Sequence, residues 1–93
     1  MIKHIVLYTI RDGVDKDATA AKIASLLEPL VGQIPGLTKM EVRRCYQGAD
    51  YALYSEFTSA EALEGYAVHP LHLAAKAQFN GLLASRLNAD YEV

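Results

Sequence analysis

The first strand of this chain has no polar face. Residues 2–10 are rich in β-branched side chains and lead into an Arg-Asp-Gly turn signal, which predicts one β-strand. Successive side chains of a strand point to opposite faces. Apolar residues occupy both faces: Val6 and Tyr8 share one, and Ile5 and Leu7 share the other. Two-sided burial is typical of a central strand, so the rest of this 93-residue chain must supply both neighbouring strands and a cover for each face.

Apolar spacing and turn residues predict six further elements. They are a helix over 15–34, strands over 37–46 and 51–57, a short helix over 58–68, a helix over 70–85 and a closing strand over 86–93. Pro29 should kink or divide the first helix, because proline lacks the N–H that the helical ladder needs. Thr58 and Glu61 have the spacing of a capping box at the start of the short helix.

The order of elements predicts an α+β domain of the ferredoxin-like βαββαβ type, formed by residues 1–93. This topology places the helices on one face of a four-stranded antiparallel sheet and leaves the other face bare. Residues 37–46 are the most polar strand, which favours an edge position. Because the first strand leaves apolar side chains on whichever face the helices do not cover, we expect a homodimer, with two sheets packed into a dimeric α+β barrel.

Composition excludes several classes of function. The formal net charge is −2, and the nine basic residues are scattered, so we expect no nucleic-acid partner. The apolar opening is too short for a signal peptide or a membrane span, and Cys45 is the single cysteine. We therefore expect a cytoplasmic protein without disulfides or membrane attachment. Glycine-rich phosphate loops are absent as well.

Candidate chemistry is concentrated in residues 66–72, Tyr-Ala-Val-His-Pro-Leu-His. Pro70 predicts that one helix stops near Val68 and that another begins at the proline, with His69 as its N-cap. His72 then lies in the first helical turn, where unpaired N–H groups disfavour a protonated imidazole. A neutral histidine can accept a proton, and Tyr66 could donate one across the break.

Blander interpretations of the same residues stay open. His-Pro at a helix start is common capping chemistry, His4 could be a core histidine bonded to a carbonyl, and Tyr66 a half-buried aromatic. A metal site built on His69 and His72 would need carboxylates such as Asp90 or Glu56. Neither a zinc-protease spacing nor a cysteine pair supports it, and we expect no metal.

Four segments together resemble the stress-responsive A/B barrel domain, or Dabb, family. They are residues 2–7 (Ile-Lys-His-Ile-Val-Leu), 34–37 (Ile-Pro-Gly-Leu), 57–63 (Phe-Thr-Ser-Ala-Glu-Ala-Leu) and the Tyr-x-x-His-Pro-x-His pattern of 66–72. The resemblance spans nearly the whole chain. It implies the dimeric α+β barrel fold.

The family includes plant stress proteins, bacterial proteins of unknown role and a plant polyketide cyclase. Tyr66 and His72 match the catalytic tyrosine and histidine of that cyclase, and His4 matches a further histidine of its site. A fourth cyclase histidine falls on Tyr51 here. The resemblance therefore implies catalytic roles for His72, Tyr66 and His4.

We expect a cavity for a small apolar or polyketide-like ligand. Its expected binding residues are Tyr51, Leu53, Val6, Tyr8 and His69. Cyclase- or lyase-like acid–base chemistry there would need no cofactor. Two alternatives remain: a non-catalytic stress-protective or ligand-binding dimer, and a cofactor-free monooxygenase, which is favoured only by analogy of fold.

Overall fold

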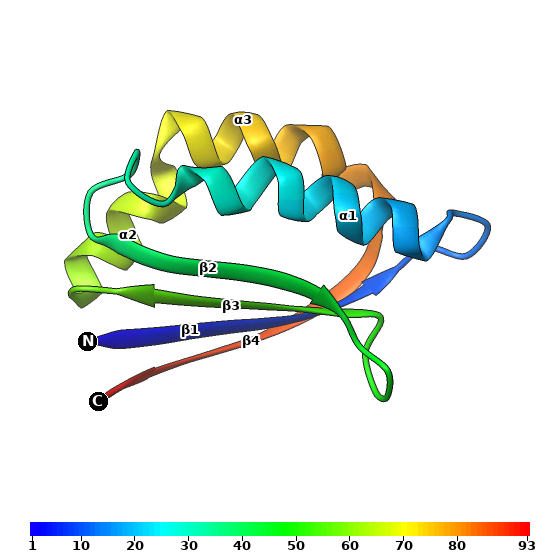
Figure 1. The fold of residues 1–93 in the computed structure, drawn as a ribbon, viewed down its shortest axis with the longest axis horizontal. Coiled ribbons are helices and arrows are strands. Elements are labelled where there is room, and N and C mark those ends of the chain that lie inside the picture. Colours follow the sequence, from blue (N-terminus) through cyan, green and yellow to red (C-terminus); the bar gives the residue numbers. More distant parts are fainter.

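A four-stranded sheet with helices along one face makes up the protein (Figure 1). The computed structural model describes all 93 residues. The elements in chain order are β1 (Ile2–Ile10), α1 (Lys16–Leu27), the 3-10 turn η1 (Glu28–Leu30), β2 (Leu37–Arg44), β3 (Tyr51–Phe57), α2 (Ala60–Val68), α3 (Pro70–Phe79), the 3-10 turn η2 (Asn80–Leu82) and β4 (Leu83–Glu92). This is the predicted ferredoxin-like order, with its second crossover divided into α2 and α3.

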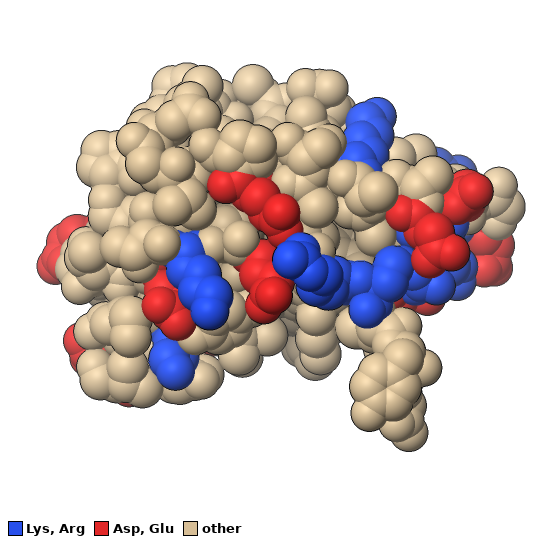
Figure 2. Space-filling view, in the orientation of Figure 1, with Lys and Arg blue, Asp and Glu red and all other residues tan.

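The sheet has the strand order β2-β3-β1-β4, and every neighbouring pair is antiparallel. β1 therefore lies between two strands, as its two apolar faces predict. β2 is an edge, and its charged side chains form a band of mixed sign in Figure 2. Arg43 from β2 is paired with Glu28 at 2.7 Å and with Glu41 at 3.8 Å. Such charges discourage another chain from adding to this edge.

One face of the sheet packs against the helices and forms the core. The largest fully buried side chains are Tyr51, Phe57, Ile10, Ile23, Leu27, Leu53 and Val6. They come from β1, β3 and α1, whose apolar residues recur at the spacing expected for strands and for a helix. The helix-facing side of β4 is polar and exposed, with Arg86, Asn88 and Asp90, so the core thins toward that edge.

The opposite face of the sheet has no helix over it and is apolar. Strand register aligns Ile5 with Tyr54 on one side and with Ala89 on the other, while Leu7 lies beside Leu87. Leu7 is 39% exposed and Leu87 is 71% exposed. A contiguous apolar patch of this kind marks an interaction surface. The expected bare, apolar face is thus present.

The break expected at Pro29 is present: α1 ends at Leu27, a 3-10 turn follows at Pro29, and Gly32, with φ of 87°, ends the segment before Ile34. Two other predicted features were wrong. The short helix is capped by Ser59, which accepts from the Ala62 N–H, and not by Thr58. The last helix ends at Phe79, so β4 begins at Leu83, three residues earlier than predicted.

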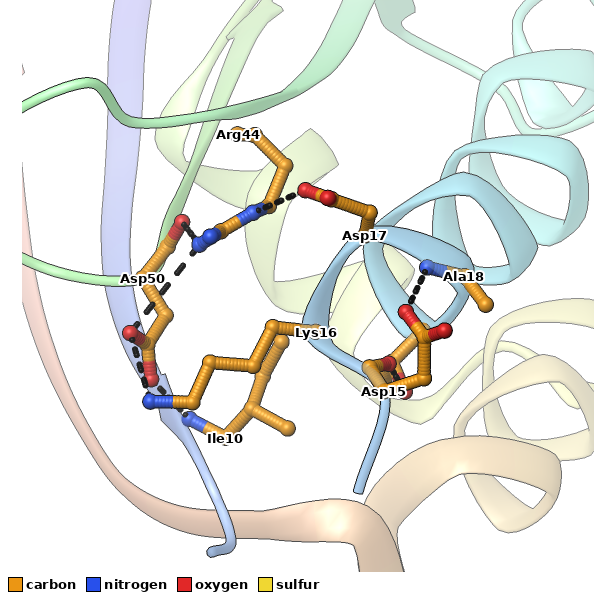
Figure 3. Close-up of polar contacts among 8 residues, drawn as sticks. Ile10, Asp15, Lys16, Asp17, Ala18, Arg44 and Asp50 are labelled. Carbon is orange, nitrogen blue, oxygen red and sulfur yellow. Dashed lines mark hydrogen bonds and ion pairs between the residues drawn. The ribbon is translucent and has the colours of Figure 1, made fainter. Parts of the chain in front are cut away.

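A polar clasp joins the start of α1 to the ends of three strands (Figure 3). The Asp50 carboxylate accepts from the Ile10 N–H at 2.7 Å and from Lys16 Nζ at 3.1 Å. Arg44 donates to the Asp50 carbonyl and to Asp17 on α1. The Ile10 N–H bond, followed by Lys16, lowers the pKa of Asp50. The clasp fixes the end of the molecule remote from the chain termini (Figure 1).

We expect Asp50→Asn to lower the free energy of unfolding by about 1–2 kcal/mol at pH 7, because it removes the charge from these hydrogen bonds. Folding lowers the pKa of Asp50, so its stabilisation is present above the ordinary aspartate value of about 3.9 and is lost as pH falls through the lower folded value. Urea denaturation at pH 7 and near pH 3 should show the difference shrinking in acid. Asp12→Asn, at an exposed carboxylate, should change little; equal losses in both variants would contradict the clasp.

Candidate functional site

The junction of α2 and α3 positions the residues singled out by sequence. α2 ends at Val68, and α3 begins with Pro70 as its first residue. His69 is the N-cap of α3, and its Nδ1 accepts from the Leu71 N–H at 3.1 Å. The imidazole of His69 is therefore committed to capping. His72 follows in the first turn of α3, as predicted.

The rings of Tyr66 and His72 stack on each other across this junction. Their centroids are 4.0 Å apart and their planes make an angle of 27°. Tyr66 is 4% exposed and also packs against Phe57 at 5.1 Å. The Nδ1 atom of His72 lies 3.4 Å from the Ala67 carbonyl oxygen. Packing on both sides of Tyr66 thus holds the pair in a fixed geometry.

The environment of His72 favours its neutral form. Burial lowers the pKa of His72; the contact with the Ala67 carbonyl opposes this shift, and the cation of Lys76, one turn further along α3, reinforces it. When Nδ1 carries the proton toward Ala67, Nε2 is an acceptor. Burial raises the pKa of Tyr66, so its hydroxyl keeps its proton and can donate. A neutral base and a protonated donor are therefore in contact.

His4 approaches the same region from β1. Its Nδ1 contacts Oδ1 of Asp90, the residue opposite it on β4. The His4 ring also meets the Phe57 ring edge to face, with centroids 6.2 Å apart. Phe57 therefore contacts both His4 and Tyr66, and Asp90 fixes the orientation of the His4 imidazole.

A partly enclosed cavity of about 120 Å³ lies between the sheet and the helices at these residues. Tyr8, Tyr66 and Leu53 contribute to its wall. Its other apolar wall residues are Leu27, Leu63, Ala67, Phe79 and Leu83. Its polar wall residues are His4, His72, Lys76, Asn80 and Arg86. An apolar cavity with a few converging polar groups is the usual form of a small-molecule site.

The cavity includes five of the eight residues named from the sequence, namely His72, Tyr66, His4, Tyr8 and Leu53. The other three, Tyr51, Val6 and His69, do not line it. Tyr51 is fully buried beneath Tyr8, with ring centroids 4.5 Å apart, and its hydroxyl has no hydrogen-bond partner. Val6 is 1% exposed in the core.

Sequence reasoning missed the polar residues supplied by the end of α3 and the start of β4. Lys76 and Arg86 look like ordinary surface cations in sequence, although Lys76 lies one turn after His72. That spacing of four residues was the available signal. No three His, Cys, Asp or Glu side chains come together in a group that could hold a metal ion. None of the helices is both long and apolar enough to cross a membrane.

The model of a family described as the stress-responsive A/B barrel domain matches residues 2–93. A stress-response A/B barrel domain-containing protein of Arabidopsis thaliana is 29% identical over 97 aligned positions, which cover 98% of this chain and 88% of that protein. The match extends over the whole fold rather than over the junction of α2 and α3 alone.

Solved structures share the same fold. A dimeric protein of unknown function and ferredoxin-like fold from Bacteroides fragilis has a TM-score of 0.89 and 34% identity, covering 99% of this chain and 95% of that one. The hydroxynitrile lyase of Passiflora edulis has a TM-score of 0.83 at 15% identity, covering 99% and 92%. At that identity the likeness extends to the fold alone.

Proposed function

Because the chain belongs to the stress-responsive A/B barrel domain family, we propose that it is a homodimeric barrel whose cavity binds a small, mainly apolar or polyketide-like ligand and performs acid–base chemistry on it. The observation that carries this proposal is the contact of neutral His72 with protonated Tyr66 in the wall of one cavity. The catalytic residues of the proposal are His72, Tyr66 and His4.

The uncovered sheet face supports the proposed homodimer. Leu7, Leu87 and Tyr91 are 39%, 71% and 47% exposed there, and burying such a patch against a second copy removes it from water. Three solved structures of this fold are described as dimeric. The cavity lies on the other face of the sheet, among the helices, so the dimer leaves its wall intact.

His72 would take a proton from a carbon next to a carbonyl group. The Tyr66 hydroxyl would donate a hydrogen bond to the oxyanion that forms, and His4, oriented by Asp90, would supply a second polar contact. A neutral imidazole suits the role of base at pH 7. These proton transfers use only groups that the chain itself provides.

The size of the cavity limits the ligand. A volume of about 120 Å³ is comparable to the engineered cavity of roughly 150 Å³ that holds benzene in another protein. One ring or a short branched chain therefore fits, and a longer polyketide-like chain would extend past the cavity mouth. The hydroxynitrile lyase from Passiflora edulis indicates only that this fold occurs in an enzyme.

We expect His72→Gln and Tyr66→Phe to lower kcat/KM by about 100-fold in assays of small aromatic aldehydes, cyanohydrins and β-polyketones, because each variant removes one proton-transfer partner. Both variants should retain ligand binding, measured by calorimetry. Tyr46→Phe is the matched control, since Tyr46 is fully exposed. Ligand binding without turnover would favour the non-catalytic alternative, and oxygen consumption with quinols would favour a monooxygenase. Unchanged turnover in both variants would exclude the acid–base pair.

A further inference from the structure

Two cations in the cavity wall have no carboxylate partner. Every ion pair of the chain involves His4, Lys16, Arg43 or Arg44. Lys76 and Arg86 line the cavity and form none. No Asp or Glu lines the cavity. Since the whole chain carries a net charge of −2, a positive cavity runs against the overall charge balance.

Hydroxyl donors lie beside these cations. Arg86 is opposite Tyr8 in the β1–β4 register. Its guanidinium counteracts the rise that burial causes in the pKa of the Tyr8 hydroxyl. Tyr66 lines the same cavity as Tyr8, and burial raises the pKa of its hydroxyl, which stays protonated. Lys76 is close enough to lower the pKa of His72. The cavity therefore collects donors around one apolar space.

The carboxylate of Asp90 does not neutralise this cluster. Asp90 lies at the edge of the site, where its Oδ1 contacts His4 Nδ1, and its side chain is 38% exposed. It is thus already engaged and partly in water. An anion that enters the cavity would find two charged donors and the Tyr8 hydroxyl without displacing an existing ion pair.

We infer that the ligand of this cavity is a small carboxylic acid with a single ring or short apolar body, whose carboxylate is bound by Arg86 and Lys76 with the Tyr8 hydroxyl. The guanidinium suits a carboxylate because its planar donors match the two oxygens. This inference rests on the proposed function, because it names the chemical class that the same cavity would bind. It also places the acid close to His72, since Lys76 and His72 are neighbours four residues apart on one helix.

Benzoate and benzamide test the inference, because they have the same shape and differ in charge. We expect wild-type protein to bind benzoate at least about tenfold more tightly than benzamide in calorimetric titrations at low salt. Lys76→Gln combined with Arg86→Gln should abolish this preference while leaving the affinity for benzamide within about twofold. Lys22→Gln, an exposed cation on α1, should retain the preference.

Each outcome decides the question. Equal binding of the two ligands by wild type, or a preference that survives the double substitution, would overturn the anion site while leaving the ligand cavity in place. Failure of wild type to bind either ligand would overturn both the anion site and the cavity function. Circular dichroism of the double variant establishes that a lost preference is not a folding defect.

Discussion

We expect Leu87→Asp to convert the proposed dimer into monomers. Leu87 is 71% exposed in the protomer and lies beside Leu7 on the uncovered face of the sheet. Docking two sheets would bury the new carboxylate without a partner, and twofold symmetry introduces it twice. The dissociation constant should rise at least about 1,000-fold, which sedimentation velocity at micromolar concentration can measure.

Leu73→Asp is the matched control for this experiment. Leu73 is 49% exposed on α3, in the helix layer, so the same substitution there should leave the dimer intact. The Leu87→Asp monomer should retain its secondary structure, because the side chain is mostly in water before assembly. A stable dimer in Leu87→Asp, or monomers in Leu73→Asp, would show that the sheet face is not the interface.

The central position of β1 was predictable because it depends on local pattern alone. Apolar residues on both faces of residues 2–10 need strands on either side and cover above and below, and the observed order β2-β3-β1-β4 provides the strands. The polarity of β2 likewise predicted an edge. Both features follow from the alternation of apolar and polar side chains along each strand, which can be seen in the sequence.

Boundaries set by competing local signals were less predictable. Apolar spacing continues past Pro29 to Ile34, although the helix ends at Leu27, because Leu30 and Ile34 still reach the core from a 3-10 turn and a loop. Thr58 and Ser59 are both capping residues, and adjacent residues of the same chemistry do not reveal which one faces the first helical turn. In the structure the Thr58 N–H donates to the Gly36 carbonyl, and the Ser59 side chain accepts from the Ala62 N–H as the helix cap.

Cavity membership was predictable where a short stretch of sequence fixes it. Tyr66 and His72 meet because a proline break brings two helices together over a few residues. Lys76 is indicated only by its position one turn after His72 on the same helix. The lining role of Arg86 depends on the pairing of β4 with β1, which nothing local in the sequence reports. The same holds for Tyr51, since only the stack with Tyr8 reveals that it lies beneath the cavity wall.

Gly36→Ala should destabilise the protein by about 2–5 kcal/mol. Gly36 has φ of 81°, where a side chain is strained, and an added Cβ would lie 2.4 Å from the Ala62 Cβ and 2.9 Å from Thr58 Oγ1. The carbonyl of Gly36 also accepts from the Thr58 N–H at 2.9 Å. Relieving the clash requires α2 to move, and α2 carries Tyr66. We therefore expect a lower Tm in calorimetry together with weaker ligand binding.

Gly32→Ala separates backbone strain from close packing. Gly32 has φ of 87° but nothing within 4 Å of an added Cβ, so its cost should be limited to about 1–2 kcal/mol of strain. Adding Ala62→Gly to Gly36→Ala should recover part of the lost stability, because it removes the methyl group that the new Cβ meets. Equal destabilisation by Gly36→Ala and Gly32→Ala, with no recovery in the double variant, would show that the contact between Gly36 and α2 does not position the helix. If the double variant recovers stability, the position of Tyr66 depends on Gly36, 30 residues earlier in the sequence. The absence of a side chain at Gly36 lets α2 approach the sheet.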